Sequence, residues 1–265
     1  MSFIQSLILA LIEGLTEFLP VSSTGHLIIA TSLMGIEPDS FVKLYLIAVQ
    51  PGAILAVLFL YQKRFFKSTG FYLKLLAGFI PAAIIGLAFN DTIDLLLESP
   101  LTVAVSLFVG GVIFLFLDSW FSQNEKESNQ DITYKRAWYV GFFQILAMIP
   151  GTSRSGATIA GGLVAGFNKK NAAEFSFFLG VPTLFAATAY KIYKFYGEEG
   201  GEVLLSHFGF LFWGNVVAFI VGMLSIKFFI GFLTKHGFKW FGWYRIIVGA
   251  LIMILILSGV SLELV

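Results

Sequence analysis

Two glutamates, a cluster of hydroxyl residues and a histidine stand close together in a part of the chain that is otherwise apolar. Glu13 and Glu17 follow twelve residues without a charge, and their spacing places both carboxylates on one face of a helix. Pro20 cannot comfortably continue that helix, and the stretch 22–25 turns the chain toward His26. Ionisable groups within membrane-like sequence are costly, so we expect them to serve a function.

The two carboxylates suit metal binding or acid–base chemistry. In a low-dielectric site they repel each other, so that one is protonated or a cation lies between them. A hard divalent ion such as Mg²⁺ takes oxygen ligands, often one or two carboxylates together with substrate phosphates. The alternative is a helix end that reaches interfacial water, with both glutamates solvated and without a role.

The hydroxyls and the histidine also admit two interpretations. Ser22, Ser23 and Thr24 could satisfy backbone groups freed by Pro20, or one of them could be a nucleophile activated by a neighbouring base. A lone histidine is more often a packing residue than a catalyst. Because two carboxylates and a serine lie within thirteen residues of His26, the pattern favours catalysis.

A second polar turn, at residues 150–156, lies in the other half of the chain. Arg154 stands there between serines, where an unpaired guanidinium in lipid would cost at least about 2.5 kcal/mol. Its planar fork suits a phosphate or a carboxylate. Gly151 and Gly156 allow close backbone approach, and a helix beginning near Ser155 would direct free N–H groups at the same anion. The alternative is a plain salt bridge to one of the two glutamates.

The composition indicates a membrane protein. Of the 265 residues, 57% are hydrophobic and 12% charged, and the mean hydropathy is +0.86; a soluble domain has about 25% charged residues. The near-neutral net charge implies no nucleic-acid partner, and the absence of cysteine excludes a disulfide framework. The first apolar stretch lacks a basic start and a cleavage site, so we expect it to belong to the mature fold.

The chain is predicted to be an all-α polytopic membrane protein with six transmembrane helices. Six apolar stretches are long enough to cross with tilt; they lie at about 42–61, 72–89, 100–121, 171–194, 207–231 and 243–262.

Two further apolar regions are predicted to be re-entrant helical hairpins, at about 3–34 and 137–167. The piece 3–18 reaches roughly 24 Å, which is short of the roughly 30 Å hydrocarbon core. The pieces beside the second polar turn are equally short. For the first region, the alternative is one kinked span with a surface loop at 35–42.

An internal repeat relates the two halves. The turn 20–25 resembles the turn 150–156, with one extra residue in the second copy, and Pro51 and Pro182 follow the closing glycines at the same distance. Each half is therefore a hairpin plus three spans, and because three is odd the copies lie in opposite orientations. The predicted units are a first inverted repeat at 1–121, a polar linker at 122–136 and a second inverted repeat at 137–265.

Basic residues predict the orientation in the membrane. With both hairpins returning to the side they enter from, the basic regions face the cytoplasm and both termini face outward. The loop 90–99 carries no basic residue, whereas three other regions do: Lys63, Arg64, Lys67 and Lys74; Lys126, Lys135 and Arg136; Lys227, Lys235, Lys239 and Arg245.

The two turns resemble the signatures of a known family, the bacterial undecaprenyl-pyrophosphate phosphatases, also called the bacitracin-resistance or BacA/UppP family. The matching motifs are residues 13–27 (EGLTEFLPVSSTGHL) and 150–158 (PGTSRSGAT), without a departure at any motif position. The resemblance covers essentially the whole chain.

The resemblance implies hydrolysis of C55 isoprenyl diphosphate to the monophosphate lipid carrier that is reused in peptidoglycan synthesis. It also implies a divalent cation (Mg²⁺ or Ca²⁺), a polyisoprenyl diphosphate lipid as substrate and possible homodimers. The active site would open to the outer side of the bacterial plasma (inner) membrane. We predict catalytic residues Glu17, Ser23, His26 and Arg154; metal ligands Glu13 and Glu17; and substrate-binding residues Ser22, Thr24, Gly25, Gln50, Gly151, Thr152, Ser153, Ser155 and Thr158.

In the predicted mechanism, Glu17 serves as metal ligand and base, Ser23 attacks the terminal phosphorus and Arg154 neutralises developing charge, with His26 assisting proton transfer. Two alternatives are His26 as the nucleophile and direct attack by metal-bound water. The rival class is a secondary transporter or lipid-carrier flippase, since such carriers also use inverted repeats and broken helices. A non-catalytic scaffold gives no reason for the charged residues at membrane depth.

Overall fold

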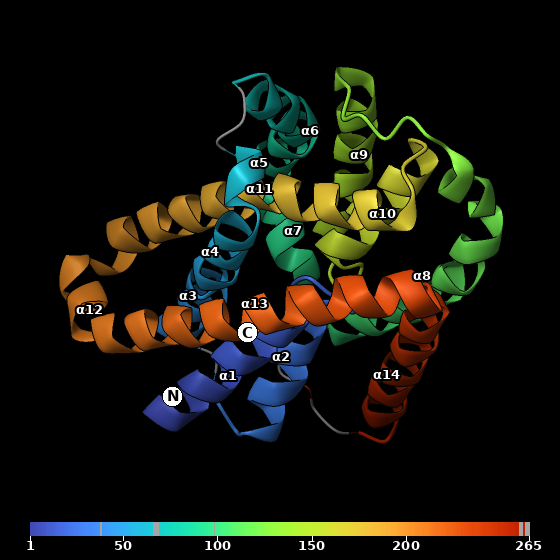
Figure 1. The fold of residues 1–265 in the computed structure, drawn as a ribbon. Helices are drawn as coiled ribbons and strands as arrows, with labels where there is room; N and C mark the ends of the chain where they lie inside the picture. Colours follow the sequence, from blue (N-terminus) through green and yellow to red (C-terminus); the bar gives the residue numbers. More distant parts are fainter. Residues whose placement is uncertain (38, 66–68, 98, 260–261, 263–265) are drawn as a thin grey trace.

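The structure, a computed structural model, describes residues 1–265 except 38, 66–68, 98, 260–261 and 263–265, and the described part contains helices and no strands (Figure 1). Lys67 of the basic loop lies outside the described residues. The elements are α1 (Phe3–Thr16), α2 (Ser23–Leu33), α3 (Ser40–Ala48), α4 (Gln50–Leu60), α5 (Gln62–Phe65), α6 (Thr69–Ala88), α7 (Asn90–Leu97), α8 (Pro100–Trp120), η1 (Ser122–Lys126), α9 (Tyr134–Ile145), η2 (Leu146–Met148), α10 (Arg154–Val164), α11 (Lys169–Glu199), α12 (Gly201–Ser206), α13 (Phe208–His236) and α14 (Lys239–Leu257).

Six of the described helical stretches are long and apolar enough to cross a membrane, which confirms the predicted helical class and the six predicted spans. They are Ser40–Leu60, Thr69–Ala88, Pro100–Trp120, Lys169–Glu199, Phe208–His236 and Lys239–Leu257. The first of them is interrupted at Val49, where α3 ends and α4 begins. The predicted loop 90–99 is largely the short helix α7, because apolar residues there recur with a helical period.

The two regions predicted as hairpins each form a pair of short helices. In the first region α1 has 14 residues and α2 has 11, and in the second α9 has 12 and α10 has 11. The members of each pair contact one another. Ser2 and Gln5 begin α1 with a reciprocal capping box, so this helix starts where its first free N–H groups have partners.

Helices from the two halves pack on each other in a reciprocal way. The first short helix of each region packs on a long helix of the other half, α1 on α13 (Figure 1) and α9 on α6. The most extensive contact between two described helices is that of α8 with α14. Gly111 and Gly242 allow this last contact, since a β-carbon on Gly242 would stand 2.9 Å from the Gly111 carbonyl oxygen. The two polar turns are thereby carried into one interior.

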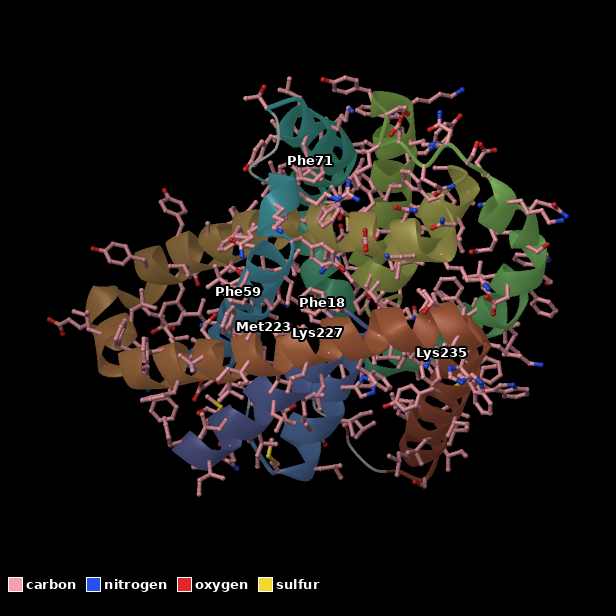
Figure 2. All side chains as sticks on the ribbon, viewed as in Figure 1. Phe18, Phe59, Phe71, Met223, Lys227 and Lys235 are labelled. Atoms are coloured by element: carbon pink, nitrogen blue, oxygen red, sulfur yellow. The ribbon has the colours of Figure 1, made fainter. Side chains whose placement is uncertain are left out.

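A buried aromatic cluster fixes the first turn in this interior. Phe18 is fully buried and packs edge-on against Phe177 of α11, with 5.3 Å between ring centroids, and Figure 2 shows it near the centre of the molecule. Phe177 in turn packs against Phe229 of α13 at 5.9 Å. Because Phe18 follows Glu17 directly, the same packing holds the backbone at the residue that carries the carboxylate.

The polar linker is bound to the body of the protein. The side-chain amide of Asn124 donates to the carbonyls of Leu163 and Phe167, at 2.7 and 2.9 Å. The side chain of Gln130 accepts from the Asn168 N–H at 2.8 Å. The linker therefore fixes the junction between α10, which begins at Arg154, and α11.

Candidate active site

The two polar turns share an unusual backbone geometry. Ser22 and Ser153 are the only non-glycine residues of the described chain with positive φ, at 69° and 73°. Each is the N-cap of the helix that follows, and its hydroxyl accepts from a backbone N–H, of Gly25 at 3.3 Å and of Gly156 at 3.1 Å. Such a conformation costs about 1–3 kcal/mol and persists only where the surrounding structure enforces it. The helices α2 and α10 therefore start in the same way, at Ser23 and at Arg154.

Glu17 joins the two turns. Its Oε2 accepts a hydrogen bond from the Ser23 hydroxyl at 2.7 Å, and its Oε1 accepts from Arg154 Nη2, also at 2.7 Å. The ion pair is nearly dry, with side-chain exposures of 10% for Arg154 and 5% for Glu17. The salt bridge considered as the alternative role of Arg154 is present in the structure. It brings an acid and a hydroxyl from the first turn to a cation from the second.

One N–H donor of the Arg154 guanidinium has no hydrogen-bond partner in the described structure. Its Nη1 donates to the Ser176 carbonyl at 3.0 Å, whereas its buried Nε has no hydrogen-bond partner among the described residues. A buried donor without a partner costs about 1–3 kcal/mol. An anionic ligand with oxygen atoms would satisfy it.

Glu13 is fully buried, and neither of its carboxylate oxygens has a hydrogen-bond partner in the described part of the chain. The Glu17 N–H donates to the Glu13 carbonyl at 2.9 Å, so the two side chains lie one helical turn apart. Unpartnered carboxylate oxygens beside a second carboxylate fit a hard divalent cation. Since the described residues contain no group of three or more His, Cys, Asp and Glu that could hold a metal, further ligands would be phosphate oxygens, hydroxyls or water.

Both ring nitrogens of His26 have hydrogen-bond partners other than the nucleophile candidate Ser23. Its Nδ1 lies 2.8 Å from the Ser22 carbonyl, which only accepts, so Nδ1 carries a proton. With Nδ1 protonated, the neutral ring accepts at Nε2 from the Tyr244 hydroxyl at 2.5 Å, and the two rings are parallel with centroids 5.5 Å apart. No hydrogen bond joins His26 to Ser23 or Glu17 in the described structure. Tyr244 was not expected from the sequence.

The other predicted site residues divide into those that build the turns and those with free side chains. The Ser155 hydroxyl bonds the Leu19 carbonyl at 2.8 Å, and that of Thr158 lies 2.6 Å from the Ser176 hydroxyl. Gly151 has φ +88°, and a β-carbon on it would overlap the Val103 backbone. Three residues are partly buried and make no side-chain hydrogen bond in the described chain: Thr24, Gln50 and Thr152.

Comparison with known proteins identifies the family. The profile described as "Bacitracin resistance protein BacA" matches residues 6–251. The chain belongs to this family. Among its relatives, proteins named undecaprenyl-diphosphatase from Flavobacterium psychrophilum and Flavobacterium johnsoniae are 54% and 55% identical over 255 and 256 residues, 96% of each chain. One of the same name from Porphyromonas gingivalis is 50% identical over 99% of each chain.

One prediction about a charged residue of this family member is wrong. The sequence pattern groups Arg245 with the basic residues that flank the spans, whereas the structure buries it completely within α14. Its guanidinium donates to carbonyls of both turns: Nη1 to Pro20 at 2.9 Å and to Thr152 at 3.0 Å, and Nη2 to Gly151 at 3.2 Å. Further bonds reach α8, to Ser106 and Leu107 at 3.2 and 3.4 Å. The sequence signal for this role is that Arg245 is followed by a long apolar stretch, because an arginine within a membrane span needs a buried partner.

The arrangement can activate a hydroxyl beside an anion. Glu17 is placed to receive the Ser23 proton, and Arg154 supplies positive charge from the opposite side. Helix α2 begins at Ser23 and helix α10 begins at Arg154. The N-terminus of a helix favours negative charge. These are the requirements of phosphoryl transfer, in which catalysis is mostly positioning and charge neutralisation.

Proposed function

We propose that this chain is an integral membrane phosphatase that hydrolyses undecaprenyl diphosphate to undecaprenyl phosphate and inorganic phosphate. One observation carries the proposal: a single carboxylate, that of Glu17, binds both the Ser23 hydroxyl and the Arg154 guanidinium across the two turns. The names of the full-length relatives support the same reaction rather than transport. The product is the lipid carrier of peptidoglycan synthesis, and its regeneration confers bacitracin resistance.

The reaction begins with proton transfer from the Ser23 hydroxyl to Glu17 Oε2. The Ser23 oxygen attacks the terminal phosphorus, the bond to the bridging oxygen breaks, and undecaprenyl phosphate leaves with the electron pair. Water then hydrolyses the serine phosphate ester and releases inorganic phosphate. Arg154 binds the phosphoryl oxygens through its unpartnered Nε, while its bond to Ser176 holds the guanidinium in place.

Glu13 and Glu17 are the proposed ligands of a divalent cation, Mg²⁺ or Ca²⁺. When bound, such an ion neutralises charge on the diphosphate. Ser22 and Ser153 hold the helix starts at which the phosphate binds, and Thr24, Gly25, Gln50, Gly151, Thr152, Ser155 and Thr158 complete the proposed substrate site.

Phosphate release from undecaprenyl diphosphate by the purified protein in detergent tests this function. With Mg²⁺ or Ca²⁺ present we expect turnover, and with a chelator we expect the rate to fall to background until the cation is restored. Glu13→Gln should require a higher cation concentration. Normal substrate binding by the wild-type protein without any phosphate release would overturn the proposed reaction.

Rapid quenching with substrate labelled in the terminal phosphate identifies the nucleophile. We expect the label on Ser23, because its hydroxyl lies 2.7 Å from a carboxylate whereas His26 Nε2 is already bonded to Tyr244. Ser23→Ala should lose the label, and Ser119→Ala, a change at an exposed serine of α8, should retain it. Label on His26 would assign it the attack, and no label on either would favour attack by water.

The proposed fold is an inverted repeat of residues 1–121 and 137–265, joined by the linker 122–136. The reciprocal packing of α1 on α13 and of α9 on α6 supports it, as does the shared positive φ of Ser22 and Ser153. The four short helices α1, α2, α9 and α10 suit two re-entrant hairpins, since each is shorter than a membrane span. The enzyme acts in the inner membrane with its site open to the outer side, as a homodimer.

Cysteine labelling tests this orientation cleanly, because the chain has no cysteine of its own. We expect a membrane-impermeant maleimide to label Glu202→Cys in intact cells, and Lys126→Cys only after the inner membrane is opened. Both positions are exposed in the structure. The reverse labelling pattern would place the linker outside and contradict the proposed orientation.

A further inference from the structure

The guanidinium of Arg154 lies against a glycine of another helix. A β-carbon built on Gly180 of α11 would stand 2.6, 2.7 and 2.8 Å from the Nη1, Nη2 and Cζ atoms of Arg154. Real β-carbons essentially never come closer than 3.0 Å to another heavy atom. The plane of the guanidinium therefore occupies the space that any side chain at position 180 would need.

Ser176, one helical turn earlier on the same face of α11, completes this support. Its carbonyl accepts from Arg154 Nη1 at 3.0 Å, and its hydroxyl lies 2.6 Å from that of Thr158. Thr158 also donates to the Arg154 carbonyl at 2.8 Å, so both ends of the arginine are bound to one small polar network. Ser176 is fully buried, and water does not compete for these bonds.

The position of the guanidinium is thus limited on three sides. Glu17 holds Nη2 at 2.7 Å, the Ser176 carbonyl holds Nη1 at 3.0 Å, and the Gly180 backbone lies against the guanidinium. Because both terminal nitrogens are held in this way, a movement of the guanidinium away from a methyl group at position 180 should lengthen one of these two hydrogen bonds. The same movement would displace the unpartnered Nε from the phosphate.

We infer that Gly180, together with Ser176, forms a shelf that positions Arg154 for the terminal phosphate, and that Gly180 is a positioning residue of the reaction. This inference rests on the proposed function. Gly180 lies outside both signature motifs, and it acts only through Arg154, since it presents no group of its own to a substrate. Its contribution is the absence of a side chain.

The first test compares Gly180→Ala with Gly197→Ala in the purified full-length protein. Gly197 lies on the same helix with nothing within 4 Å of its missing β-carbon, so it reports the effect of alanine on the helix alone. We expect Gly180→Ala to lower kcat/KM roughly 100-fold, as a misplacement of about 1 Å does. Gly197→Ala should keep the wild-type rate and unfold at or above the wild-type temperature, and Gly180→Ala should remain folded at the temperature of the assay. Equal rates for Gly180→Ala and wild type would overturn the inference.

A double-mutant cycle separates positioning from packing. We expect Gly180→Ala to have almost no further effect in the Arg154→Ala background, because the group it displaces is gone. A second loss of roughly 100-fold in that background would mean that Gly180 acts through helix packing, and the inference would fail. Failure of the proposed function is distinct from both results, since it would show as no phosphate release from the wild-type protein.

Discussion

Glu17→Gln is expected to lower kcat for phosphate release by about 10²–10⁴-fold, the range that follows the loss of a general base. Glutamine keeps the volume of the side chain but cannot take the proton of Ser23, and it leaves the buried Arg154 without its counter-charge. Loss of one proposed cation ligand adds to the effect. The measurement is single-turnover phosphate release at saturating substrate and cation.

A matched control for this variant is Glu202→Gln, at an exposed glutamate of α12, which should keep the wild-type rate. Thermal unfolding in detergent shows whether Glu17→Gln remains folded. A folded Glu17→Gln protein with wild-type kcat would contradict the proposed role of Glu17 as base. It would mean that another group accepts the proton of Ser23.

Arg245→Met is expected to destabilise the protein by at least about 3 kcal/mol, because several buried carbonyl acceptors lose their donor at a cost of about 1–3 kcal/mol each. Three of those carbonyls belong to the two polar turns, at Pro20, Gly151 and Thr152. The turns should separate, so activity should fall even at temperatures where the variant stays folded. Denaturant unfolding and phosphate release measured on one preparation test both effects.

Two further variants define what Arg245 contributes. Arg245→Lys keeps the charge but not the planar fork, so we expect an intermediate loss of stability. Lys239→Met removes an exposed charge from the same helix and should leave stability within about 0.5 kcal/mol of wild type. Wild-type stability of Arg245→Met would show that the turns are held by packing and not by this guanidinium.

Much of the fold could be predicted from local pattern. Apolar length alone located the six spans, and the interruptions at Pro20 and Pro150 located the two turns. The spacing of Glu13 and Glu17 placed both carboxylates one helical turn apart, because helix geometry is the same in any context. The same local pattern indicated Arg154, whereas Ser23 was selected from three neighbouring hydroxyl residues by the resemblance to the family.

The partners of these residues could not be predicted in the same way. The sequence left Arg154 with two possible glutamates and predicted that His26 assists proton transfer. In the structure Arg154 pairs with Glu17, and the side chain of His26 bonds the Tyr244 hydroxyl. Whether Ser23 meets a carboxylate or an imidazole depends on rotamers set by neighbouring helices. Periodicity contains no information about that choice.

The sequence by itself determined the membrane class, the six apolar spans and the positions of the two polar turns, because each depends on composition and on regular helix geometry. Only the tertiary structure decided that α14 supplies Arg245 to both turns and that α11 supplies the shelf at Gly180. Both supports come from helices outside the two motifs. Their effect arises from backbone carbonyls and from an absent side chain, which become specific contacts only when the helices pack together.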